Sequence, residues 1–205
     1  MTKITKSIII GFLILTTLGL AGFLYTLVMH TSNLPVLGEP GHTAGAFAFY
    51  NQAGKKITEK DIAGKVTVAE YFFTSCPGIC KVMSRHLKEV YQAFKDREDF
   101  AILSHTVDPE TDSVPVLANY ARQLKAEAPA WQFLTGNKYD LYTMARQDYL
   151  LAVEDTVEAG SKEDFIHTEY VALLDKKRRI RGFYDATNKK SVDQLVNDIS
   201  ALLKE

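Results

Sequence analysis

Cysteine is scarce in this sequence. Its 205 residues include two cysteines, Cys76 and Cys80, separated by Pro77, Gly78 and Ile79. One such pair cannot provide the framework of a disulfide-rich domain, and closing so small a loop adds little stability. Net charge is also nearly absent, at −1, which removes the global positive charge expected of a nucleic-acid-binding protein. The two cysteines are therefore candidates for metal binding or redox chemistry.

Charged residues are absent from residues 8–29, which are almost entirely apolar. At about 1.5 Å per residue, a helix of this length can cross a hydrocarbon core of about 30 Å. Lys3 and Lys6 precede it, and no Lys or Arg follows until Lys55, so residues 1–7 are expected in the cytoplasm. We expect a single-pass anchor in the inner (cytoplasmic) membrane, with the C-terminal domain on the periplasmic or extracytoplasmic side. A cleaved signal peptide is the alternative.

Residues 30–43 contain several Gly and Pro residues and are expected to be a linker, followed by one domain at 44–205. Residues 66–73 are rich in β-branched and aromatic side chains, as in a central strand that is buried on both faces. Apolar residues at three- and four-residue steps predict a helix at 77–94. Further strands are expected at 47–50, 55–58, 100–107, 131–134, 169–174 and 179–184, and further helices at 114–124, 139–146 and 191–203, the last capped by Ser191.

This alternation of strands and helices, closed by a hairpin and a helix, predicts an α/β fold of the thioredoxin-like kind, with a central mixed sheet flanked by helices. Chemistry in that fold is expected where the first central strand meets its helix, which is here the segment 74–80. Cys76 is placed on the turn and Cys80 in the first helical turn, with Pro77 suited to the first helical position. A helix N-terminus favours thiolates, so both cysteines are expected to ionise readily.

Three uses of this pair compete: a structural disulfide, a redox-active dithiol and a metal site. Redox motifs usually have two residues between the cysteines, whereas this pair has three. Two soft sulfurs select soft ions such as Cu(I), but they need a third ligand. His167 is the best candidate, because it precedes a strand expected beside the cysteine turn, where thioredoxin-like oxidoreductases have a cis-proline. Of the other histidines, His30 and His42 are expected in solvent, His86 faces away from the cysteines, and His105 is expected to be a hydrogen-bonded structural residue in a strand.

Several stretches of the sequence are similar to one protein family. They are GKVTVAEYFFTSCPGIC, SHTVDPETDSVPVLANYARQL, WQFLTGN and IHTEYVALLDKKRRIRGFYDA. Together they resemble the Sco/SenC family of copper-binding cytochrome c oxidase assembly proteins. The resemblance implies one copper ion, as Cu(I) or Cu(II), held by Cys76, Cys80 and His167.

The resemblance also implies a metallochaperone rather than a turnover enzyme. The expected partner is cytochrome c oxidase subunit II or another copper-accepting protein, with a thiol reductant as a further partner. The alternative is a membrane-tethered thiol-disulfide oxidoreductase in which Cys76 and Cys80 form the redox-active disulfide. Asp108 is predicted to orient a ligand or partner, or else to form a turn before Pro109. The chain departs from the family at Gly78, Lys81 and Ile166, and Lys81 is expected to favour the thiolates.

Overall fold

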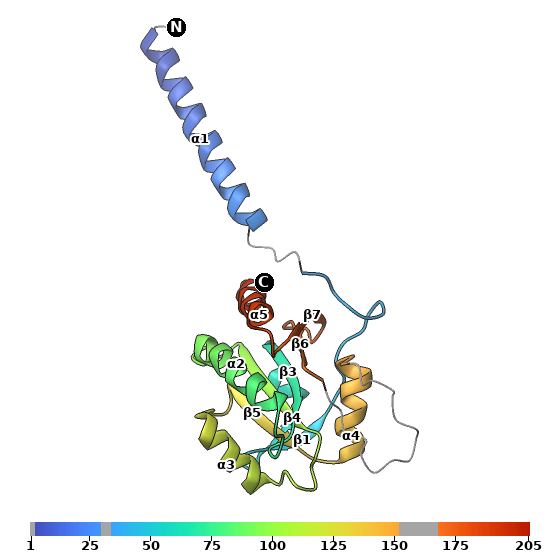
Figure 1. Cartoon of the computed structure of the whole chain (residues 1–205). Helices are drawn as coiled ribbons and strands as arrows, with labels where there is room; N and C mark the ends of the chain where they lie inside the picture. The colour runs from blue at the N-terminus through green and yellow to red at the C-terminus, as the bar shows by residue number, and fades with distance from the viewer. Residues whose placement is uncertain (1–2, 30–33, 152–167) are drawn as a thin grey trace. The chain divides into compact units, whose positions relative to one another are not determined.

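The computed structural model describes residues 3–29, 34–151 and 168–205 (Figure 1). Helix α1, Lys3–Met29, covers the segment expected to cross the membrane. Among the described residues, no helix meets the length and apolarity needed for a membrane span. This part of the structure therefore gives no support to the predicted anchor at 8–29. The chain divides into two units, and the compact domain extends from Leu34 to Leu203.

A mixed seven-stranded sheet forms the centre of the domain, in the order β2-β1-β5-β4-β3-β6-β7. The three central strands β3, β4 and β5 are parallel, and the outer strands pair antiparallel to them and to each other. The predicted hairpins are both present, as β1–β2 and β6–β7. The strands are β1 Ala48–Asn51, β2 Lys56–Thr58, β3 Val66–Phe72, β4 Phe100–Thr106, β5 Trp131–Thr135, β6 Tyr170–Leu174 and β7 Ile180–Asp185.

Helices cover both faces of the sheet. Side chains along β3 alternate between the two faces and show which helices pack on each. Val66, Val68 and Phe72 point into a core shared with α2, α3 and α5, while Ala69 and Tyr71 point into a second core shared with α4. The helices are α2 Ile79–Phe94, α3 Val114–Leu124, α4 Lys138–Thr143 and α5 Lys189–Leu202. A 3-10 turn, Glu59–Ile62, and a π-helical turn, Met144–Asp148, complete the elements.

The expected sheet and helices are confirmed, with shifts of two residues at the starts of α2 and α5. Helix α2 begins at Ile79 instead of Pro77, because Gly78 has a non-helical backbone (φ −119°, ψ −109°) and occupies the cap position. Helix α5 is capped by Asn188, not Ser191, since the Asn188 side chain accepts hydrogen bonds from the N–H groups of Lys190 and Ser191. Part of the expected linker, from Leu34 on, belongs to the domain, and Leu37 N–H bonds to the carbonyl of Ile180 at 2.9 Å.

Candidate metal and redox site

The two cysteines come together where β3 ends and α2 begins. Cys76 lies on the turn, its N–H bonded to the carbonyl of Phe73 at 3.2 Å, and Cys80 is in the first turn of α2. Both are free thiols, and each side chain is 6% exposed. The Cys80 thiol acts as a donor that lowers the pKa of Cys76, so the two side chains lie close enough to interact. The pair is therefore held close together and largely shielded from solvent.

The two thiols differ in acidity, contrary to the expectation that both ionise readily. Burial acts to raise the pKa of Cys76. Hydrogen bonds from the Cys80 thiol and from the backbone of Cys80 and Gly78 act in the opposite direction, as does the positive charge of Lys81. Together they outweigh burial, and the pKa of Cys76 is lowered. Burial raises the pKa of Cys80, and the neighbouring Cys76 raises it further. Cys76 is therefore the readier thiolate, while Cys80 retains its proton and donates to it. Lys81 acts on Cys76 as the sequence predicts.

Asp112 fixes the turn that carries the cysteines, and sequence reasoning missed it. Its carboxylate is fully buried and accepts hydrogen bonds from the backbone N–H of Thr74 at 3.1 Å and from the hydroxyls of Thr74 and Thr106. It thereby ties the end of β3 to the end of β4. Asp112 is the last residue of the run Val-Asp-Pro-Glu-Thr-Asp, which could have indicated it. Sequence reasoning selected the first Asp of this run, Asp108, instead.

Asp108 itself forms a turn in the structure. Its Oδ1 accepts from the N–H of Thr111 at 3.3 Å, and its carbonyl accepts from the N–H of Asp112 at 2.8 Å. Its own N–H donates to the hydroxyl of Thr106 at 2.9 Å. Asp108 therefore supports the segment that positions Asp112. Its predicted role in orienting a metal ligand or a partner stays a prediction.

A buried glutamate lies in the core near the cysteines. Glu70 is 1% exposed in the middle of β3, between Val68 and Phe72 on the α2 face. Its Oε1 accepts from the hydroxyl of Ser104, which itself accepts from Trp131 Nε1 at 2.8 Å, and its Oε2 has no hydrogen-bond partner among the described residues. Burial raises the pKa of Glu70 to about 7, with the Ser104 bond acting against it.

The charge of Glu70 acts on this site, because it also raises the pKa of Cys80. On α3, Tyr120 lies close by. Its hydroxyl shares a 2.9 Å hydrogen bond with Ser84 of α2, and its ring stacks on Phe72. Sequence reasoning missed Glu70 as well, and the signal was one acidic residue inside an otherwise apolar central strand.

The histidines are placed as follows. His167, the predicted third ligand, lies outside the described residues. His86 turns away from the cysteines, with Nδ1 2.7 Å from the carbonyl of Ala186. His42 is not solvated as expected, because its Nε2 lies 2.9 Å from the carbonyl of Asp148. His105 is fully buried and stacks on Tyr71, but neither ring nitrogen makes a hydrogen bond among the described residues, and burial lowers its pKa to about 4.

The described residues do not form a complete metal site. In this part of the chain, no three His, Cys, Asp or Glu side chains are grouped so that they could hold an ion. The cysteine pair still fits a soft ion by its chemistry, because it offers two adjacent sulfurs. The predicted third ligand, His167, lies outside the described residues, so the complete site stays a prediction.

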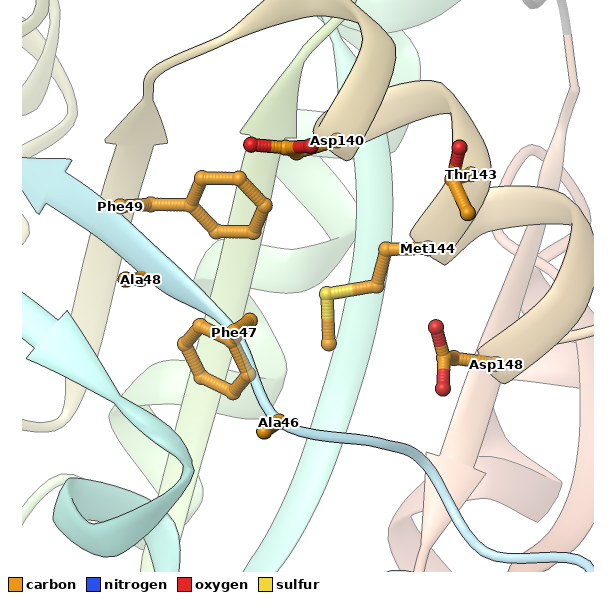
Figure 2. Close-up of a pocket in the computed structure, with 8 residues that line it drawn as sticks. All are labelled: Ala46, Phe47, Ala48, Phe49, Asp140, Thr143, Met144 and Asp148. Atoms are coloured by element: carbon orange, nitrogen blue, oxygen red, sulfur yellow. The ribbon is translucent and has the colours of Figure 1, made fainter.

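The domain also has a pocket of about 440 Å³ that does not include the cysteines. Figure 2 shows Phe47 and Phe49 on one side of it and Met144 and Asp148 on the other. Asp148 is already engaged there, since its Oδ1 accepts from the N–H of Gly45. Because Phe47, Phe49 and Met144 belong to the core shared with α4, this pocket lies on the opposite face of the sheet from α2.

Residues 36–204 match the family model SCO1/SenC. The chain belongs to the SCO1/SenC family. It is 26% identical over 157 residues to the SCO1 protein homolog of Bacillus subtilis (strain 168), covering 76% of this chain and 80% of the relative.

Two solved structures extend the comparison. ScoI of Arabidopsis thaliana, solved with copper bound, is 26% identical with a TM-score of 0.60, over 77% of this chain and 98% of the other. BsSco, a member of the Sco family of cytochrome c oxidase assembly proteins in which a disulfide switch was identified, is 24% identical with a TM-score of 0.68, over 84% and 98%. The mixed sheet flanked by helices is thus the fold of Sco proteins, as the sequence predicts.

Proposed function

We propose that this protein binds one copper ion through Cys76, Cys80 and His167 and assists assembly of the copper centre of cytochrome c oxidase. The observation that carries the proposal is the convergent pair of thiols at the start of α2, in a chain of the SCO1/SenC family. Two sulfurs suit Cu(I), and an added imidazole suits Cu(II). The copper ion is what the copper-accepting protein would receive, and Cys76, Cys80 and His167 of this chain would hold it until transfer.

The residues around the pair have distinct tasks in this proposal. Cys76 supplies the first thiolate, because its pKa is lowered, and Cys80 must give up its proton before it can serve as a ligand. Asp112 fixes the backbone of the turn that carries the sulfurs, through the N–H of Thr74. The recipient is cytochrome c oxidase subunit II or another copper-accepting protein, and a thiol reductant keeps the pair reduced. Asp108 remains a predicted contributor to ligand or partner orientation.

Copper content and the visible spectrum of a set of variants test the proposal. Cys76→Ser and Cys80→Ser should each abolish tight binding of both oxidation states. His167→Ala should keep some Cu(I) binding through the sulfurs but lose the Cu(II)–thiolate absorption band. His86→Ala is the matched control, since His86 faces Ala186, and it should bind copper like the wild type. If His167→Ala retains the wild-type Cu(II) spectrum, His167 is not the third ligand.

A thiol-disulfide oxidoreductase is the alternative function, and the unequal acidity of the two thiols favours it. A nucleophile of lowered pKa beside a protonated resolving thiol suits disulfide exchange. A wild-type protein that takes up no copper but reduces a model disulfide would decide for this alternative.

The position of the domain outside the cytoplasm stays a prediction from the sequence. It rests on Lys3 and Lys6 ahead of the apolar segment and on the lack of Lys and Arg from there to Lys55. A reporter enzyme fused after Glu205 that is active only outside the cytoplasm would support it, and activity inside would contradict it.

A further inference from the structure

We propose that the start of α2 is a docking face for a partner protein whose own cysteines lie in an acidic surface. This face consists of the cysteine turn, Ile79 and a basic stripe, which we define as Lys81, Arg85 and Lys88. The inference rests on the proposed function, because it describes the protein that meets Cys76 and Cys80. It goes further by assigning the partner's charge and the residues that recognise it.

The basic stripe lies along one side of α2. Its members are four and three positions apart, so they share a helix face that begins beside Cys80. Lys81 and Arg85 are exposed and Lys88 is half-buried. Within the described residues, none of the three has an ion-pair or side-chain hydrogen-bond partner. The acidic residue of α2, Glu89, is by contrast paired with Lys189 at 3.1 Å.

The charge of this stripe is not needed to hold the domain together, since no carboxylate of the described residues neutralises it. The whole chain has a net charge of −1, so the stripe is a local excess of positive charge and not a general property. Charges that have no paired carboxylate, at the edge of a reactive site, attract oppositely charged partners and repel like-charged ones. A partner with Asp and Glu residues around its cysteines is therefore favoured.

Ile79 supplies an apolar contact within this face. It lies between Gly78 and Cys80, and its side chain is 41% exposed although the cysteines beside it are buried. An exposed aliphatic residue bordered by charges is the usual arrangement of a small interface centre and its polar rim. Because each cysteine is 6% exposed, a partner must approach this spot closely to reach a sulfur.

The exchange reaction that reports on docking balances in atoms and electrons. The Cys76 thiolate attacks one sulfur of the partner's disulfide, and the other partner sulfur leaves as a thiolate. Cys80 then loses its proton to solvent and attacks Cys76, which releases the second partner thiolate. The chain's dithiol is oxidised to a disulfide, and the partner's disulfide is reduced to a dithiol.

The test uses the reduced full chain and two synthetic disulfide peptides, one with Glu and one with Lys on either side of its cysteines. Mass spectrometry follows the exchange, and each rate is divided by the rate of the same peptide with dithiothreitol, which also attacks as a thiolate but has no basic residues beside it. At low ionic strength the Glu peptide should react about tenfold faster than the Lys peptide, and the difference should shrink at high ionic strength. Equal normalised rates for the two peptides would overturn the proposal.

Variants locate the effect. Arg85→Gln with Lys88→Gln should lose the preference for the Glu peptide, while Lys81 is kept because its charge also acts on Cys76. The matched control is Lys56→Gln with Lys60→Gln. Both lysines are exposed, Lys56 on β2 and Lys60 just after it. Three strands, β1, β5 and β4, lie between β2 and β3, the strand that leads into the cysteine turn. The control should keep the preference. A preference that survives in the Arg85/Lys88 variant, or that is lost equally in the control, overturns the assignment.

Copper content is measured on the same preparations, so the two proposals fail separately. A chain that binds no copper but prefers the Glu peptide overturns the copper function and supports this docking face. A chain that binds copper but shows no preference overturns the docking face alone.

Discussion

The carboxylate of Asp112 accepts a hydrogen bond from the backbone N–H of Thr74 at 3.1 Å, two positions ahead of Cys76. Through this contact, the loop after β4 holds the loop after β3. The hydroxyls of Thr74 and Thr106 donate to the same carboxylate, so one buried acidic group satisfies three donors. The cysteine turn thus depends on a residue far from it in the sequence.

Replacing Asp112 with Ala should therefore both destabilise the domain and loosen the cysteine pair. Three donors, that of Thr106 fully buried and the two of Thr74 partly buried, lose their acceptor at once, and we expect the free energy of unfolding to fall by about 3 kcal/mol. Urea unfolding of the full chain measures the loss. Asp96→Ala serves as the control, because Asp96 is exposed near the C-terminal end of α2 and should change stability by less than about 0.5 kcal/mol. If both variants unfold at the same urea concentration, Asp112 does not support the turn.

The fold could be predicted from the sequence because its elements carry strong local signals. Val114–Leu124 begins and ends where its apolar pattern predicts, and the buried strand Val66–Phe72 differs from its prediction by one residue. The start of α2 could not be predicted from Pro77 alone. The backbone of Gly78 determines that start, and its angles depend on how the turn packs.

The cysteine pair could be predicted because its spacing is local, whereas its surroundings could not. Asp112 reaches the site from a position far from it in the chain, and Glu70, although on the strand that leads into the turn, bonds to Ser104 of β4, so both roles depend on the pairing of β3 with β4. His105 was predicted to be a hydrogen-bonded structural residue. It is buried as expected, but aromatic rings surround it and its nitrogens have no hydrogen bond among the described residues. A pattern of strand residues indicates burial and does not reveal which partners the other strands provide.

The unequal thiols lead to a prediction about reactivity. At neutral pH, Cys76 should be alkylated by iodoacetamide well before Cys80, because the thiolate is the reacting form. Cys80→Ala removes the hydrogen bond to Cys76 and should shift the pH profile of Cys76 alkylation to higher pH. Cys80→Ser keeps a hydroxyl donor and should shift it less. Peptide mapping after timed alkylation measures both effects, and preferential labelling of Cys80 in the wild type would contradict the assignment.

The last prediction concerns Glu70, whose buried carboxyl has its pKa raised from 4.5 to about 7. The folded protein then holds a proton that the unfolded chain releases between these two values. The contribution of protonated Glu70 to stability is therefore fully present below pH 4.5 and is lost as the pH rises through 7. From the size of this shift, the wild type should lose about 3 kcal/mol over that range from this group alone.

Glu70→Gln keeps the shape of the side chain and cannot ionise, so it should remove this loss. The variant should be about as stable as the wild type at pH 4.5 and about 3 kcal/mol more stable at pH 8. Urea unfolding at both pH values measures the difference. Glu89→Gln is the matched control, because Glu89 is exposed on α2 and its only expected loss is the surface ion pair with Lys189, worth less than about 1 kcal/mol. A Glu70→Gln variant whose stability falls with pH in parallel with the wild type would show that Glu70 does not carry a buried charge at pH 8.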